Sequence, residues 1–344
     1  MGYVSQAQFE EDQRRPMPAP VEGVSLEGEV VIVTGANTGI GYEAAKHFAI
    51  RGPKKLIMMA RNEARGRPAV EKLKQETGFQ NVELWLMDFS SFESVKATKE
   101  KIDQLERLDI LVENAALTLE DYTVTKDGWE NILQVNHLSF GLHAMYHIPK
   151  MLETAKKYGA NPRIVLVSSD THYWTRVPAE AIEAPNSLEF LNSKEYSTRE
   201  GIMGGQRYME SKILATMLIR RFQAHLPPNS PTVTCCAVNP GFCLSELRRG
   251  VTGEAAEEYR KMEEELAFTA EEGSRQLLYA AIGQRDREEE VRGGYVSFMK
   301  VTECSDFILG EEGQKLENKL WTETMDVLGK VDERTKDIVK QYLS

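Results

Sequence analysis

A serine, a tyrosine and a lysine in this sequence have the types and spacing needed to move a proton. Ser169 follows an apolar run typical of a strand, and Tyr208 and Lys212 lie four residues apart in a segment with a helical pattern. That spacing places the phenol and the ammonium on one face of a helix. A phenol has a solution pKa of about 10, but a nearby ammonium favours the phenolate. Tyr208 can then donate a proton to a carbonyl oxygen as a hydride arrives, while Ser169 donates a hydrogen bond to that oxygen.

The pattern Tyr-x-x-x-Lys recurs along the chain, so position has to decide which copy does chemistry. The copies begin at Tyr42, Tyr122, Tyr146 and Tyr208. Tyr42 lies within the helix after the first strand, Tyr122 lies in a predicted loop, and the helix of Tyr146 is expected to break at Pro149. Tyr208 follows a serine at a strand end and lies on an unbroken helical pattern. The other interpretation of Tyr208 is a half-buried tyrosine on a helix.

A glycine-rich turn follows the first apolar run and opens the first helix. Glycines let the backbone turn tightly and come close to a pyrophosphate, and the helix N-terminus offers free N–H groups to it. A glycine trio can also be an ordinary turn, but the strand before it and the helix after it favour a dinucleotide site. The predicted cofactor residues of this turn are Gly35, Asn37, Thr38, Gly39, Ile40 and Gly41.

The end of the second strand indicates which dinucleotide binds. An acidic residue about 20 positions beyond the glycines would bind the ribose of NAD. Arg61 stands there instead, with Arg65 and Arg67 nearby. A guanidinium pairs with a 2′-phosphate, so we predict NADP(H) rather than NAD. The alternative is a solvated basic start of a helix.

Two polar residues end the next strands. Asp88 ends the third strand, where it either accepts a hydrogen bond from the adenine amino group or caps the following helix. Asn114 ends the fourth strand, beside small residues that let a flat ring lie close to the backbone. We predict that both belong to the cofactor site.

Apolar runs alternate with helical patterns from residue 28 onward. This alternation predicts an α/β fold with a single Rossmann-type, doubly wound parallel sheet of about seven strands flanked by helices. One domain is expected over residues 28–344, preceded by an extended arm over residues 1–27 that contains Pro16, Pro18 and Pro20. Residues 170–203 and 242–268 do not fit the alternation and follow strand ends, so we expect them to bind the substrate. The highly charged end of the second segment is either a solvated helix over the cleft or a mobile lid.

Composition excludes several classes of function. The chain has 344 residues and a net charge of −11, which argues against nucleic acid as a partner. It has neither a signal-peptide pattern nor an apolar run long enough to span a membrane. Its four cysteines are expected to be reduced thiols in a cytoplasmic protein, with Cys243 a small apolar residue. His143 and His147 have zinc-pair spacing, but no third ligand is apparent, so we predict no metal site.

These motifs together resemble the short-chain dehydrogenase/reductase superfamily over about residues 28–300. The resemblance identifies Asn136, Ser169, Tyr208 and Lys212 as the catalytic residues, with Asn136 holding a water in the proton relay and Lys212 also contacting the nicotinamide ribose. It adds Pro240, Gly241 and Ser245 to the cofactor site, with Ser245 near the carboxamide. The chain departs from the family at Glu113 and Ala116, where asparagine and glycine are usual; this is expected to alter packing on the adenine side.

The resemblance implies hydride transfer between NADP(H) and a ketone or aldehyde and its alcohol. Ala60-Arg61-Asn62 is similar to the retinol-dehydrogenase-like branch, and Asn239-Pro240-Gly241-Phe242-Cys243 to fungal secondary-metabolism reductases. A ketoreductase acting on a lipophilic small molecule is expected. Oxidation of a retinoid- or steroid-like alcohol, a non-catalytic NADP-binding regulator and a homo-oligomer stay open. The aromatic residues of 170–203 either form a wall for a bulky apolar substrate or pack that segment down. They are His172, Tyr173, Trp174, Phe190 and Tyr196.

Overall fold

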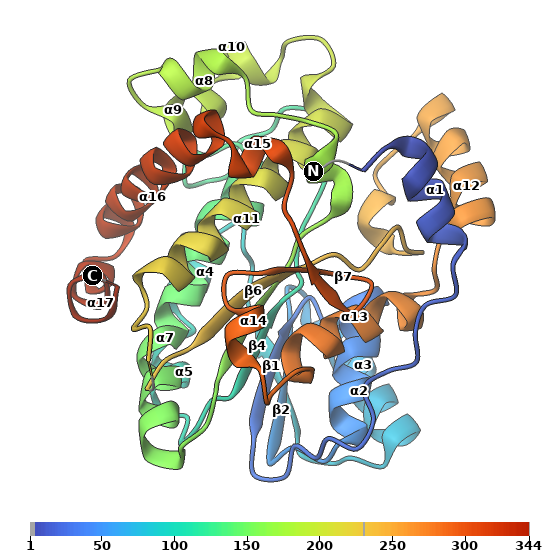
Figure 1. The fold of residues 1–344 in the computed structure, drawn as a ribbon, viewed down its shortest axis with the longest axis vertical. Coiled ribbons are helices and arrows are strands. Elements are labelled where there is room, and N and C mark those ends of the chain that lie inside the picture. The colour runs from blue at the N-terminus through green and yellow to red at the C-terminus, as the bar shows by residue number, and fades with distance from the viewer. Residues whose placement is uncertain (1–3, 230, 344) are drawn as a thin grey trace.

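One twisted sheet forms the centre of the molecule (Figure 1). The computed structural model describes residues 4–229 and 231–343, and in this part of the chain eight strands pair in the order β3-β2-β1-β4-β5-β6-β7-β8. The first seven are parallel and β8 is antiparallel to β7. Their bounds are Val30–Thr34, Lys55–Ala60, Val82–Leu86, Ile110–Glu113, Arg163–Val167, Thr234–Val238, Tyr295–Ser297 and Lys300–Thr302. The predicted doubly wound α/β fold is confirmed, with one antiparallel edge strand more than expected.

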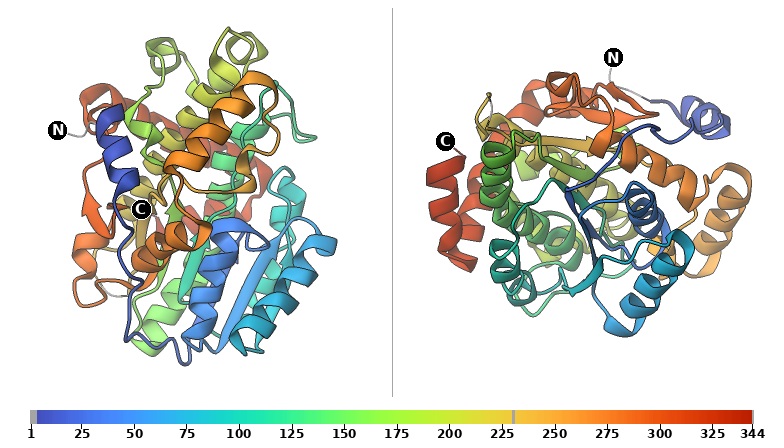
Figure 2. Two further views of the ribbon diagram at one scale, coloured as in Figure 1. Left: turned by 90° about the vertical axis from the view of Figure 1, so that its right-hand side faces the viewer. Right: turned by 90° about the horizontal axis from the view of Figure 1, so that it is seen from below.

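Helices cover both faces of the sheet, which is why its central strands are apolar throughout. One face carries α2 (Gly39–Ile50), α3 (Glu63–Thr77) and α13 (Ala270–Ile282). The other face carries α4 (Phe92–Lys96), α5 (Lys99–Asp103), α7 (Ser139–Tyr158) and α11 (Arg207–His225). The C-terminal helices α16 (Glu311–Val331) and α17 (Arg334–Tyr342) pack on α11 and α7 as a further layer (Figure 2).

The N-terminal arm is not wholly extended as predicted. Residues 6–14 form helix α1 (Gln6–Arg14). Ser5 caps its N-terminus, and the Ser5 hydroxyl accepts a hydrogen bond from the Gln8 N–H. The three prolines lie beyond this helix, so they bound it rather than prevent it. Residues 1–3 of the predicted arm, like Ser230 and Ser344 of the predicted domain, lie outside the described residues.

The expected break at Pro149 does not occur, because α7 continues through Pro149. The helix is buried along most of its length, and this packing offsets the backbone hydrogen bond that proline cannot make. The long pattern instead changes geometry earlier, where α6 (Asn131–Leu133) leads through the π-helical turn η1 (Gln134–Leu138) into α7. Tyr146 is buried and its hydroxyl donates to Asp332, so this copy of the motif is structural.

The two irregular segments lie together at the upper end of the molecule in Figure 1. The first holds four short helices and a π-turn: η2 (Asp170–Tyr173), α8 (Ala179–Glu183), α9 (Ser187–Asn192), α10 (Lys194–Ser197) and η3 (Ile202–Gln206). The second holds η4 (Glu246–Arg248) and the solvated helix α12 (Gly253–Leu266). The short helices α14 (Glu288–Val291) and α15 (Asp306–Leu309) flank the edge strands. No helix in the described ranges is both long and apolar enough to cross a membrane.

Candidate active site

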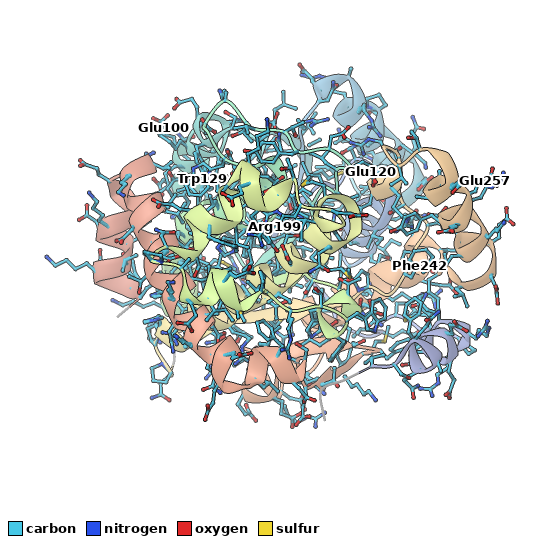
Figure 3. The ribbon with its side chains drawn as sticks, turned by 90° about the horizontal axis from the view of Figure 1, so that it is seen from above. Glu100, Glu120, Trp129, Arg199, Phe242 and Glu257 are labelled. Atoms are coloured by element: carbon cyan, nitrogen blue, oxygen red, sulfur yellow. The ribbon has the colours of Figure 1, made fainter. Side chains whose placement is uncertain are left out.

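A cavity of about 640 Å³ opens where β1, β4, β5 and β6 end, at the point where the strand order reverses. Ligands bind at this position in open α/β sheets. Figure 3 looks down on this end and labels Glu120 and Phe242, two of the residues that line the cavity. The predicted site residues that line it are Gly35, Asn37, Thr38, Gly39, Ile40, Gly41, Arg61, Asp88, Asn114, Ser169, Tyr208, Lys212, Pro240, Gly241 and Ser245.

The glycine turn has the geometry of a phosphate cradle. Gly35 and Gly39 have φ of 62° and 58°, in the left-handed region that favours glycine. A side chain at Gly41 would collide with the carbonyl oxygen of Gly35 and with the amide of Asn114. Helix α2 begins at Gly39, and Thr38 does not cap it with its side chain, so the first N–H groups stay available to an anion. The residues present therefore fit a dinucleotide pyrophosphate.

A buried network behind the cradle fixes its shape. The Thr34 hydroxyl accepts hydrogen bonds from the N–H groups of Asn114 and Ala115, at 2.9 and 3.1 Å, and donates to Glu113 at 3.1 Å. The other Glu113 oxygen lies 2.5 Å from Nδ1 of His143. Glu113 thus turns into the protein, away from the cavity that Asn114 lines. Glu113 stands where the family usually has asparagine, and here its carboxylate contacts the buried His143 of α7.

Two arginines that line the cavity beyond the end of β2 have different partners. Arg61 is exposed at the cavity wall, and no hydrogen bond or ion pair to it occurs within the described residues. Arg65 is paired with Glu246, which reaches across from η4. Glu246 also accepts a hydrogen bond from the Thr38 hydroxyl at 3.4 Å. Arg61 is therefore available to a 2′-phosphate, whereas Arg65 is already neutralised.

Asp88 does not cap a helix, because Ser91 is the N-cap of α4. Its Oδ1 accepts hydrogen bonds from the N–H and the hydroxyl of Ser90, at 2.9 and 2.8 Å. This turn holds the carboxylate at the cavity wall. Contact with adenine stays a prediction.

The three catalytic candidates line the same cavity. Lys212 Nζ lies 5.3 Å from the centroid of the Tyr208 ring and donates a hydrogen bond to the carbonyl oxygen of Val167 at 2.8 Å. Burial lowers the pKa of Lys212 to about 8. Burial raises the pKa of Tyr208 above its ordinary value, so the phenol keeps its proton at neutral pH in this structure. Ser169 lies at the end of β5, where its hydroxyl accepts from the Thr171 N–H at 3.2 Å.

Two charged neighbours of Tyr208 were not expected from the sequence. The Arg248 guanidinium opposes the effect of burial and favours the phenolate of Tyr208. Asp170 lies beside Ser169, whose hydroxyl donates to it at 3.3 Å, and burial raises the pKa of Asp170 to about 6. Arg248 is one of two consecutive arginines after the sixth strand, which was the only sequence signal for it.

Asn136 is the predicted catalytic residue that the structure does not bring to the cavity wall. It is buried in η1, where its Nδ2 donates to the Leu117 carbonyl and to the Ser211 hydroxyl, both at 2.9 Å. Its Oδ1 accepts from the Leu117 N–H at 3.0 Å. The side chain thus ties the loop after β4 to α11, and both of its N–H donors are used.

The aromatic residues of 170–203 divide between the two expected roles. Trp174 lines the cavity. His172 is buried against Tyr173 and Tyr295, with ring centroids 4.0 and 4.6 Å away. Phe190 and Tyr196 pack on each other at 5.0 Å and against the core. Most of these rings therefore hold the segment down, and Trp174 lines the cavity.

The residues that we discounted are buried. All four cysteines are free and buried, and burial raises the pKa of Cys243 to about 12, so it acts as a small apolar residue. His143 and His147 lie in the core, and within residues 4–229 and 231–343 no three or more His, Cys, Asp or Glu side chains form a group that could hold a metal ion.

Comparison with known proteins gives the family. The short chain dehydrogenase family matches residues 29–177, a region that ends within the segment 170–203 and before Tyr208. The short chain dehydrogenase sol3 of Alternaria solani is 33% identical over 282 residues, covering 82% of this chain and 93% of that protein. The short chain dehydrogenase/reductase dmxR8 of Cryptosporiopsis sp. is 30% identical, covering 91% and 94%.

A solved structure has the same fold. The short-chain dehydrogenase of Sphingobium yanoikuyae in complex with NADPH aligns with a TM-score of 0.52 at 22% identity, covering 76% of this chain and 85% of that chain. The resemblance expected from the motifs is confirmed by the sequence relatives. This chain belongs to the short-chain dehydrogenase family.

Proposed function

We propose that this protein is an NADP(H)-dependent reductase that converts a ketone or an aldehyde of a lipophilic small molecule of secondary metabolism into an alcohol. One observation carries the proposal: Tyr208, Ser169 and Lys212 line the same cavity as the glycine cradle and the unpartnered Arg61. The NADPH bound to the Sphingobium yanoikuyae neighbour supports the choice of cofactor. NADPH, when bound, supplies the hydride.

The residues divide the remaining work. Tyr208 donates its hydroxyl proton to the carbonyl oxygen, and the Ser169 hydroxyl donates a hydrogen bond to that oxygen as charge develops on it. Lys212 and Arg248 stabilise the phenolate that is left. Asn136 acts as a positioning residue, because it joins Leu117 at the cavity wall to the helix that carries Tyr208.

The protonated form of Tyr208 is the form that reduction of a carbonyl requires. A raised pKa keeps the phenol protonated, which is the form that donates to a carbonyl. Oxidation of an alcohol would require the phenolate as base. Initial rates of carbonyl reduction and of alcohol oxidation, measured at one pH, compare the two directions. A larger kcat/KM for the alcohol would assign the enzyme to oxidation instead.

A paired titration tests the proposal. NADPH and NADH are added separately to the purified protein and nicotinamide fluorescence is followed; NADPH oxidation is then measured with a panel of ketones and aldehydes. We expect tight, selective NADPH binding followed by turnover. A preference for NADH would overturn the cofactor assignment, and binding without turnover would favour a regulator.

A further inference from the structure

Helix α1 is fastened to the second substrate segment by one buried side chain. The amide of Gln13 is 5% exposed, and its Nε2 donates to the carbonyl oxygens of Phe242 and Leu266, both at 2.9 Å. Its Oε1 accepts from the Phe242 N–H at 3.1 Å. Arg14 adds an ion pair to Glu265 of α12 at 2.5 Å. The amide uses both donors and its acceptor, so α1 has a defined place beside the cavity.

Phe9 lies one turn before Gln13, on the same face of α1, and reaches the cavity. Its ring is 6% exposed and meets Trp174 edge to face, with centroids 5.1 Å apart and planes at 88°. It meets Phe242 at 6.4 Å and 71°. The Trp174 indole N–H donates to the carbonyl oxygen of Val4 at 2.7 Å, so the N-terminal segment also orients the indole.

The opposite side of this part of the cavity comes from α12. Tyr259 and Met262 line it, and Figure 3 shows Phe242 between α1 and α12. The Arg248 guanidinium lies 4.4 Å from the Phe242 ring centroid and 5.6 Å from that of Tyr259. Its charge is paired with Glu263 at 2.6 Å. The guanidinium is thus held against these rings by an ion pair, and the rings and Met262 give this part of the cavity an aromatic and apolar surface.

We propose that α1 forms a wall of the substrate site and that Phe9, Trp174 and Phe242 bind a flat, uncharged aromatic ring next to the reacting carbonyl. This inference rests on the proposed reductase function. Perpendicular rings at 5–6 Å present edges and faces to which a further planar ring adds in the preferred edge-to-face or offset geometry. The carbonyl of such a ketone then lies on the side of Ser169 and Tyr208, which line the same cavity.

The test compares two ketones with the same number of carbons, α-tetralone and methyl octyl ketone, by calorimetric titration. The variant Phe9→Leu keeps an apolar side chain that can hold α1 in place but removes the ring. The matched control is Gln6→Ala, on the exposed side of the same helix. We expect α-tetralone to bind Phe9→Leu several-fold to about tenfold more weakly than wild type, in line with one lost aromatic contact. The control should match wild type, and methyl octyl ketone should bind all three proteins alike.

Two outcomes would overturn the inference: equal weakening of both ketones, as undocking of α1 would cause, or no weakening of either. The reduction of α-tetralone by NADPH is measured separately. Binding that depends on Phe9, without reduction of α-tetralone or of any ketone or aldehyde of the panel, would remove the proposed reductase function and leave the aromatic wall in place. If wild type and Phe9→Leu reduce α-tetralone with the same kinetics, the reductase function stands and the aromatic wall is excluded.

Discussion

The ammonium of Lys212 lies over the ring of Tyr208 while its hydrogen bond goes to the Val167 carbonyl at the end of β5. The lysine thus joins the helix that carries the phenol to the strand that leads to Ser169. This geometry holds a cation beside the phenol, and no carboxylate among residues 4–229 and 231–343 forms an ion pair with it. The rate of proton transfer from Tyr208 should therefore fall when Lys212 loses its charge.

Removing the phenol oxygen should abolish turnover and spare cofactor binding. Tyr208→Phe keeps the ring beneath Lys212 but has no proton to donate, so kcat should fall by about 10²- to 10⁴-fold. The matched control is Tyr122→Phe, which changes the same Tyr-x-x-x-Lys pattern in a loop and should keep wild-type rates. Steady-state kinetics and an NADPH titration check both variants; a Tyr208→Phe enzyme with near-normal kcat would exclude Tyr208 as the acid.

The pH profile should report the Lys212 ammonium. Because burial lowers its pKa to about 8, the charge that favours the phenolate is lost as pH rises through 8, and kcat should fall there. The unfolded chain keeps this proton until about pH 10, so between these values the contribution of Lys212 to stability rises with pH. The fall in activity should therefore occur without a fall in Tm from this group. The Lys212→Arg side chain keeps its charge, so any remaining activity of this variant should not fall as pH rises through 8. If kcat still falls there, another group causes the fall.

Arg61 should determine the preference for NADPH. Arg61→Ala removes an unpaired guanidinium at the cavity wall, so NADPH should bind about 10- to 100-fold more weakly, as expected for a lost charge-assisted hydrogen bond, with little change for NADH. Arg67→Ala is the control, because Arg67 lies outside the cavity and pairs with Glu63 at 2.6 Å. If Arg61→Ala loses affinity for NADPH and NADH equally, Arg61 does not contact the 2′-phosphate.

Glu246 should oppose NADPH binding. Its carboxylate pairs with Arg65 and repels a phosphate at the same place, so Glu246→Gln should tighten NADPH about twofold to fivefold, the range of an exposed ion pair. The control Glu63→Gln breaks a comparable pair, with Arg67, away from the cavity and should leave the affinity unchanged. Weaker NADPH binding in Glu246→Gln would mean that the Glu246–Arg65 pair helps to hold the cofactor.

The sheet and the cavity-lining residues were predictable because local patterns determine them. Continuous apolar runs mark strands buried on both faces, and glycine is required at Gly35, Gly39 and Gly41 by φ or by close approach. Helix α1 was missed because its stability depends on Phe9 and Gln13, whose partners lie far away in the sequence. The prolines that follow it suggested an extended chain. Local propensity was overridden by tertiary contacts.

Charges whose partners are distant in sequence were also missed. Neither Glu246 nor Arg248 belongs to a motif, and each becomes important only because η4 folds over the cavity toward Arg65 and Tyr208. For Asn136 the family motif predicted the position but not the burial. The π-helical turn around it was not detectable from periodicity, and the side chain bonds to Leu117 and Ser211 behind the cavity wall.

The docking of α1 has a consequence for how the protein is made. Gln13 is separated from Phe242 and Leu266 by 229 and 253 residues, so α1 leaves the ribosome long before its binding surface exists. At about 5–20 residues per second, synthesis of the intervening chain takes roughly tens of seconds. During that time Phe9 has neither Phe242 nor α12 to pack against. The sheet and the glycine turn can assemble first, and the wall that α1 contributes to the cavity is completed only when this early segment meets a much later one.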